Sequence, residues 1–173
     1  MASEAALGEA TSDLEFTRLI DAPRALVFEV WTEPKHFARW FGPHEVDVPF
    51  CKIEPKPSGL IHFCHRYRGT DIWVKGAYRE FVAGERLVFE LGFVDVDGRP
   101  TAHPMFPDWP VDAIILTTVT FTDRGGQTEL NIQQQILPAE AAAKSAVQRA
   151  REATRVGWTE TLERLADYLG TEP

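Results

Sequence analysis

The chain contains few cysteines and no long apolar run. Cys51 and Cys64 are the only cysteines in 173 residues, and one bridge cannot build the disulfide framework of a secreted domain. We therefore expect a reducing, cytoplasmic setting. No segment approaches the roughly 18 consecutive apolar residues that a membrane-spanning helix needs. Residues 1–13 contain no Lys or Arg and lack the apolar stretch of a signal peptide, so we expect a disordered N-terminal tail.

Basic residues are also scarce. Lys and Arg total 18 against 26 Asp and Glu, which gives a formal net charge of -8. No run of basic residues forms the stripe that a phosphate backbone or an anionic lipid surface requires. The sequence therefore predicts neither a nucleic acid nor a membrane as partner.

The apolar pattern of residues 14–170 predicts one domain of strands and helices, which suits a chain of this length. Alternating apolar residues between Gly- and Pro-rich breaks predict strands, and their short connections make them antiparallel. Pro23 and Pro34 are typical of helix starts. The expected strands are 14–20, 44–54, 60–67, 72–82, 86–94, 113–122 and 128–136. Three helices are expected: residues 23–32, a second helix that starts at 32–34 and ends at 40, and residues 138–169.

Residues 95–112 interrupt this pattern between two expected strands. The segment contains four prolines beside Met105, Phe106 and Trp109. Prolines exclude it from the interior of a sheet, while the apolar side chains require cover. Two interpretations stay open, a lid over the mouth of a cavity and a packed structural loop.

The last segment, 138–169, is rich in Ala, Glu and Arg and predicts one long helix. Its apolar seam, which includes Trp158, Leu162 and Leu165, can lie along a curved sheet. Gly157 inside this helix lowers its stability by roughly 1 kcal/mol relative to Ala. We therefore expect close approach of another group at Gly157, either the sheet or a ligand.

Several motifs in this order resemble a known family. They are Asp21-Ala22-Pro23 with Val27-Phe28, then the run 31–43 with Trp40-Phe41-Gly42-Pro43, and finally Gly157-Trp158. Together they resemble the START-related superfamily of birch-pollen-allergen-like proteins and polyketide cyclases, in its branch of activator of heat-shock protein 90 ATPase homologues. The resemblance implies an α+β helix-grip fold, with a curved antiparallel sheet of about seven strands, two short helices and a long C-terminal helix.

Polar residues in the inward register of the strands indicate a binding site. Side chains alternate between the two faces of a strand, so His65, Tyr67, Tyr78, Glu80 and Gln134 are expected to face the long helix. A buried polar group needs a partner, and a hydrophobic cavity with a ligand would supply one for several at once. The predicted ligand-binding residues are Trp40, Phe63, His65, Tyr67, Tyr78, Phe89, Phe121, Gln134 and Trp158.

The sequence offers only weak candidates for chemistry. His65 and Glu80 could act as a base and the group that orients it, but no spacing rule brings them together. The cluster of His62, Cys64 and His65 with Cys51 contains zinc-type ligands, yet alternation points His62 and Cys64 away from His65. We expect no metal and no cofactor.

These observations predict a protein that binds a small apolar or aromatic molecule between the sheet and the long helix. The alternatives are a cyclase or related proton-transfer enzyme that uses the same pocket, and a chaperone-interacting protein similar to the heat-shock protein 90 ATPase activators. A homodimer is a further expectation for its assembly.

Overall fold

The computed structural model describes residues 14–137 and 141–171, and leaves the side chains of 141–144 and 147 undescribed. The expected N-terminal tail, residues 1–13, lies outside the described part. The elements are β1 (Leu14–Ile20), α1 (Arg24–Thr32), α2 (Pro34–Trp40), β2 (Val46–Ile53), β3 (Leu60–Tyr67), β4 (Thr70–Val82), β5 (Arg86–Val94), β6 (Ile114–Asp123), β7 (Thr128–Leu137) and α3 (Ala141–Gly170). The predicted α+β helix-grip fold is confirmed, and the expected element boundaries differ by at most a few residues.

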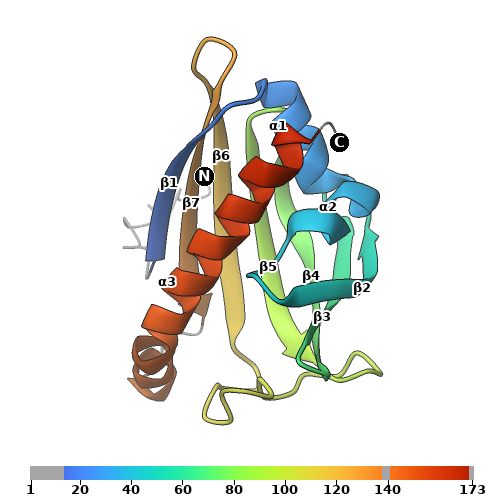
Figure 1. Cartoon of the computed structure of the whole chain (residues 1–173). Coiled ribbons are helices and arrows are strands. Elements are labelled where there is room, and N and C mark those ends of the chain that lie inside the picture. The colour runs from blue at the N-terminus through green and yellow to red at the C-terminus, as the bar shows by residue number, and fades with distance from the viewer. Residues whose placement is uncertain (1–13, 138–140, 172–173) are drawn as a thin grey trace, which may run out of the picture.

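All seven strands form one antiparallel sheet with the order β1-β7-β6-β5-β4-β3-β2. Strands β2 to β7 follow one another as a meander. The first strand, β1, pairs with the last, β7, so that Phe16 lies opposite Ile132. The sheet curves around α3, which crosses its concave face (Figure 1). Helices α1 and α2 lie at the end of the sheet where α3 terminates, and the segment 95–112 lies at the opposite end.

The core lies on the concave face of the sheet, where the predicted alternation is confirmed. Leu87, Val119, Leu130 and Ile132 all have 0% exposure. Trp31 of α1 fills the space between this face and α3, and it stacks against Trp158 with ring centroids 6.4 Å apart. Because these rings occupy the end of the sheet near α1 and α2, open space can remain only toward the other end.

Candidate ligand-binding site

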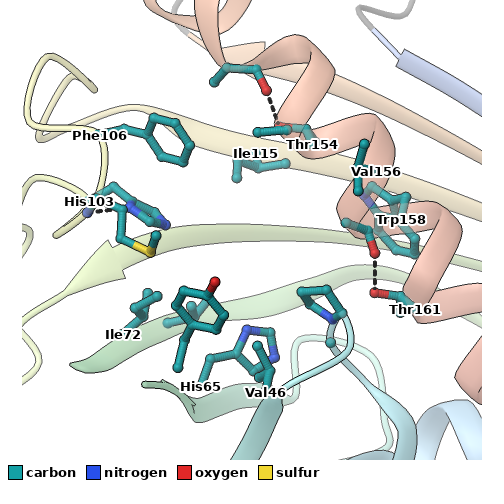
Figure 2. A pocket seen from close by; sticks show the side chains of 18 of the residues that line it. Val46, His65, Ile72, His103, Phe106, Ile115, Thr154, Val156, Trp158 and Thr161 are labelled. Atoms are coloured by element: carbon teal, nitrogen blue, oxygen red, sulfur yellow. Dashed lines mark hydrogen bonds between the residues drawn. The ribbon is translucent and has the colours of Figure 1, made fainter. Parts of the chain in front are cut away.

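A pocket of about 610 Å³ lies between the concave face of the sheet and α3. The sheet, α3, the loop at residues 41–45 and the insertion at residues 95–112 all contribute to its wall. Figure 2 shows His65 and Ile72 on the sheet, His103 and Phe106 on the insertion, and Trp158 on α3, all around the same space. The pocket therefore brings together segments that are far apart in the sequence.

The walls of the pocket are mostly apolar. The strands place alternate residues toward α3, and this geometry aligns large aliphatic and aromatic side chains along one surface. The sheet residues that line the pocket include Phe63, Ile72, Val74, Leu91, Phe93 and Ile136. Such a surface favours an apolar occupant, because apolar contact area removed from water contributes roughly 25 cal/mol per Å².

One turn of α3 faces the pocket without filling it. Gly157 lines the pocket, and a Cβ added there would meet nothing within 4 Å. The sheet therefore does not approach Gly157 closely, contrary to the first of the two sequence-based expectations. Thr161 donates a hydrogen bond from Oγ1 to the Gly157 carbonyl at 2.7 Å, so the side chain of Thr161 bonds back to its own helix at this turn.

Gln134 of β7 and Trp158 of α3 form a hydrogen-bonded polar part of the pocket wall. Trp158 Nε1 donates to Gln134 Oε1 at 3.0 Å, and Gln134 Nε2 donates to Thr117 Oγ1 at 3.2 Å. All three side chains are buried. Gln134 therefore lines the pocket, and it also joins β7 to α3 and β6 by hydrogen bonds.

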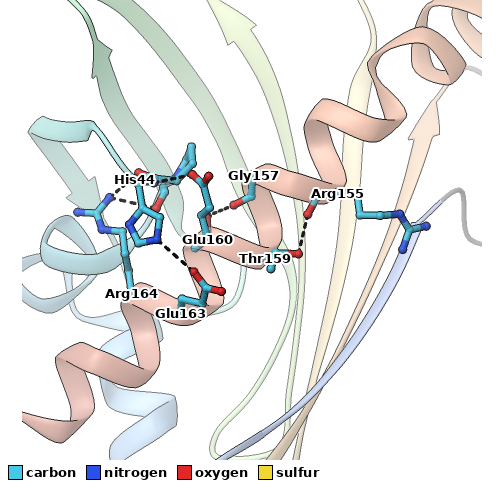
Figure 3. A network of polar contacts seen from close by, with 10 residues as sticks. His44, Arg155, Gly157, Thr159, Glu160, Glu163 and Arg164 are labelled. Carbon is cyan, nitrogen blue, oxygen red and sulfur yellow. Dashed lines mark hydrogen bonds and ion pairs between the residues drawn. The ribbon is translucent and has the colours of Figure 1, made fainter.

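The rim loop, residues 41–45, is held against α3 by Arg164. Arg164 Nη1 donates to the carbonyls of Gly42, Pro43 and Val46 at 2.9 to 3.0 Å. Next to it, the His44 backbone N–H donates to Glu160 Oε2 at 2.9 Å (Figure 3). Burial lowers the pKa of Arg164, but a guanidinium stays protonated at any physiological pH. The clamp therefore fixes one edge of the pocket mouth.

The insertion at residues 95–112 closes the far end of the pocket. Trp109 packs edge-to-face on Phe93 with ring centroids 5.9 Å apart, and it belongs to a small apolar cluster with Ile136 and Ala150. Asp108 accepts hydrogen bonds from Arg149 of α3. The insertion is thus a packed segment in this structure, and four of its residues, including His103 and Trp109, line the pocket.

Two histidines face the pocket in defined orientations. His65 on β3 contacts the Phe41 carbonyl through Nε2 at 3.1 Å, and Gly42 allows this approach because its missing Cβ would lie 3.2 Å from that nitrogen. His103 Nδ1 accepts from the Met105 backbone N–H at 3.0 Å. Burial lowers the pKa of both side chains to about 4. Both imidazoles are therefore neutral at pH 7.

The structure separates the nine predicted ligand-binding residues into two groups. Phe63, His65, Tyr67, Gln134 and Trp158 line the pocket. The other four are buried core residues outside the lining, namely Trp40, Tyr78, Phe89 and Phe121. They lie at the end filled by α1 and α2, where Trp40 Nε1 donates to the Val30 carbonyl at 2.9 Å and Phe121 packs on Phe28.

The inward orientation expected for Glu80 is wrong. The register between β4 and β5 shifts between Tyr78 and Glu80, so Phe81 turns into the core and Glu80 turns outward to pair with Arg86 at 3.2 Å. His65 pairs with Ile72 on β4, and Glu80 follows eight residues later, which corresponds to about 25 Å along a strand. The structure therefore does not bring His65 and Glu80 together.

The cysteines and histidines of β2 and β3 are divided between the two faces of the sheet. Cys51 packs against the core, and burial raises the pKa of its thiol to about 12. His62 lies on the outer face against Trp73, with ring centroids 5.5 Å apart. Within residues 14–137 and 141–171, no cluster of three or more His, Cys, Asp or Glu side chains is arranged to hold a metal ion.

Sequence reasoning missed the pocket residues that lie on loops. His103 and Phe106 line the pocket from the insertion, and Gly42 lines it from the rim loop. The available signal was the group of apolar side chains among the prolines of the insertion. Alternation along strands, which identified His65 and Gln134, contains no information about residues outside the strands.

A curved antiparallel sheet that grips a long C-terminal helix, with a pocket between them, defines a START-like helix-grip protein. Residues 21–170 match the family described as activator of Hsp90 ATPase homolog 1-like protein, and the chain belongs to this family. A comparison with curated protein sequences gave no significant match. No helix in the described part of the chain is both long and apolar enough to cross a membrane.

Solved structures share this fold at low sequence identity. A protein from Arthrobacter aurescens has a TM-score of 0.75 at 21% identity, with 92% of this chain and 86% of that chain covered. A protein from Mycobacterium smegmatis has a TM-score of 0.73 at 18% identity, with coverage of 90% and 88%. The AHSA1 protein from Silicibacter pomeroyi has a TM-score of 0.68 at 20% identity, with coverage of 92% and 99%. At these identities the likeness concerns the fold alone.

Proposed function

We propose that this protein binds a small, mostly apolar molecule in the pocket between the sheet and α3. The observation that carries the proposal is the pocket itself, whose volume of about 610 Å³ falls within the roughly 300 to 1,000 Å³ of small-molecule sites. Its apolar walls and few polar groups also match the usual composition of such sites.

Gly157 supports the proposal independently. A glycine inside a helix lowers stability by about 1 kcal/mol relative to alanine, and a Cβ at this position would meet no protein atom within 4 Å. Packing within the protein therefore does not require the glycine. Gly157 lines the pocket, so a larger side chain at residue 157 would take up space that an occupant of the pocket could use.

The other sequence-based predictions about function, assembly and location have less support than ligand binding. The cyclase alternative lacks support from the proposed pair, since Glu80 is engaged with Arg86 at the surface. A chaperone partner, suggested by the family description, and a homodimer stay predictions, as does one domain over residues 14–170. A cytoplasmic location is supported by the two free thiols, Cys51 and Cys64.

A pocket-filling variant tests the proposal. Gly157→Leu places a branched side chain in the pocket and removes the helix-destabilising glycine, so the protein should stay folded. We expect the affinity for an uncharged solvatochromic dye, a naphthyl ketone, to fall by about tenfold or more, as a clash of over 1 kcal/mol would produce.

Thr159→Leu is the matched control, because Thr159 lies two residues further along α3 and is exposed. It adds the same side chain outside the pocket, and dye affinity should stay within about twofold of the native value. Equal dye binding by the native protein and Gly157→Leu would contradict the proposal.

A further inference from the structure

The hydrogen bond of His65 determines which of its nitrogens can meet a ligand. Nε2 lies 3.1 Å from the Phe41 carbonyl oxygen, and a carbonyl only accepts, so Nε2 must hold the proton. In a neutral imidazole the other nitrogen, Nδ1, then presents a lone pair. Nδ1 has no hydrogen-bond partner among the residues that the structure describes. His65 therefore offers a hydrogen-bond acceptor.

His103 is held in the complementary way. The Met105 backbone N–H donates to its Nδ1 at 3.0 Å, so Nδ1 presents the lone pair and Nε2 holds the proton. Its ring packs edge-to-face on Phe93, with centroids 4.5 Å apart, which fixes its orientation. Figure 2 shows the His103 and His65 rings on the wall of the same pocket. His103 therefore offers a hydrogen-bond donor.

The distribution of charge around the pocket disfavours ions. None of the described lining residues is Lys or Arg, and the lining carboxylates, Glu45, Glu152 and Glu160, are exposed or half-exposed at the mouth. An anion inside would find no Lys or Arg on the lining, and Arg164 beside the pocket is already engaged with the carbonyls of Gly42, Pro43 and Val46. The three carboxylates would repel such an anion. A cation would be attracted to these solvated carboxylates and not to the apolar interior. Inside the pocket it would lose its hydration without gaining a charged partner, and burying such an unpaired charge is costly.

We propose that the pocket selects an uncharged apolar molecule that carries both a hydroxyl and a carbonyl group, with the hydroxyl donating to His65 Nδ1 and the carbonyl accepting from His103 Nε2. This inference rests on the proposed function and narrows it to a chemical class of ligand. The aromatic and aliphatic walls hold the body of the molecule, and the two imidazoles orient it.

Matched naphthalene probes test the two contacts separately. The neutral probes are naphthalene, 2-naphthol, 2-acetylnaphthalene and 6-acetyl-2-naphthol, and the charged probes are naphthalene-2-carboxylate and 2-naphthylmethylammonium. Each competes with the neutral dye for the native protein near pH 7. We expect 6-acetyl-2-naphthol to bind most tightly, and both charged probes to bind at least about tenfold more weakly than it.

Two conservative variants assign the contacts to atoms. His103→Asn keeps an oxygen that can accept from the Met105 N–H and removes the donor at the position of Nε2, because the shorter Asn amide cannot place its N–H there. It should weaken the two acetyl probes by about twofold to tenfold, the range for one hydrogen bond, and leave naphthalene and 2-naphthol unchanged. His65→Gln keeps an N–H for the Phe41 carbonyl and removes the acceptor at the position of Nδ1, because its own acceptor, the amide oxygen, lies elsewhere. It should weaken the two hydroxyl probes by a similar factor and leave 2-acetylnaphthalene unchanged.

The outcomes separate this inference from the proposed function. If naphthalene binds the native protein and not Gly157→Leu, the pocket is a binding site whatever the variants show. Charged probes that bind as tightly as neutral ones, or variants that weaken all probes equally, would then overturn the inference alone. If the dye binds the native protein but no neutral probe displaces it, the inference fails alone. If neither the dye nor any neutral probe binds the native protein, both the inference and the proposed function fail.

Discussion

Gln134 connects the last strand to the long helix, and its replacement measures what that connection contributes. Its Oε1 accepts from the buried Trp158 Nε1 at 3.0 Å. Gln134→Leu keeps a side chain of similar size and removes this acceptor, so the indole N–H is left without a partner. An unsatisfied buried donor costs about 1 to 3 kcal/mol, and we expect the free energy of unfolding to fall by that amount.

Urea melts followed by circular dichroism measure the change. Gln133→Leu is the matched control, because Gln133 is the preceding residue of β7 and lies on the exposed face; its effect should stay within about 0.5 kcal/mol. In a Trp158→Phe background, which lacks the indole N–H, Gln134→Leu should lose most of its cost. A Gln134→Leu protein as stable as the native one would refute the reasoning, as would a cost that is unchanged in the Trp158→Phe background.

Arg164→Met should lower the free energy of unfolding by about 2 kcal/mol in urea melts, because the carbonyls of Gly42, Pro43 and Val46 lose a charged donor; a change below about 0.5 kcal/mol would contradict the clamp. Gly157→Ala should raise thermal stability by about 1 kcal/mol, and a destabilised variant would mean that the added methyl meets protein atoms. Stability should also fall as the pH drops from about 6.5 toward 4, because the unfolded imidazole of His65 takes up a proton that the folded one, with a pKa of about 4, does not. His65 accounts for about 3 kcal/mol of this loss at the low end, and His103, whose pKa burial also lowers to about 4, adds to it. Melts near pH 7 and pH 5 should show a smaller drop for His65→Gln than for the native protein, and equal drops would speak against this origin.

The fold could be predicted closely because its strands and helices follow simple periodicities. The alternation of β5, with Leu87, Phe89 and Leu91 inward, corresponds to what the structure contains. The shift at Tyr78 could not be predicted, since a bulge depends on how two strands pair and not on the sequence of one. This single shift moved Glu80 from the expected inner face to the surface.

The site was harder to predict than the fold. Strand alternation identifies inward residues, but it does not tell which of them face a pocket and which face a neighbouring helix. Phe63 and Phe121 are both inward aromatic residues, yet Phe121 packs against α1 while Phe63 lines the pocket. That difference depends on where α1 and α2 cover the sheet. His103, on an irregular loop, had no periodicity to mark it.

The five tryptophans allow a direct test of where a ligand binds. Trp158 and Trp109 line the pocket, whereas Trp73 lies beside His62 and Phe50 on the outer face of the sheet. In a nitrogen–proton correlation NMR titration with 6-acetyl-2-naphthol, the proposed function predicts that the indole signals of Trp158 and Trp109 shift in a saturable way while that of Trp73 stays in place. A saturable shift of Trp73, with Trp158 and Trp109 unchanged, would contradict it and direct attention to the outer face of the sheet.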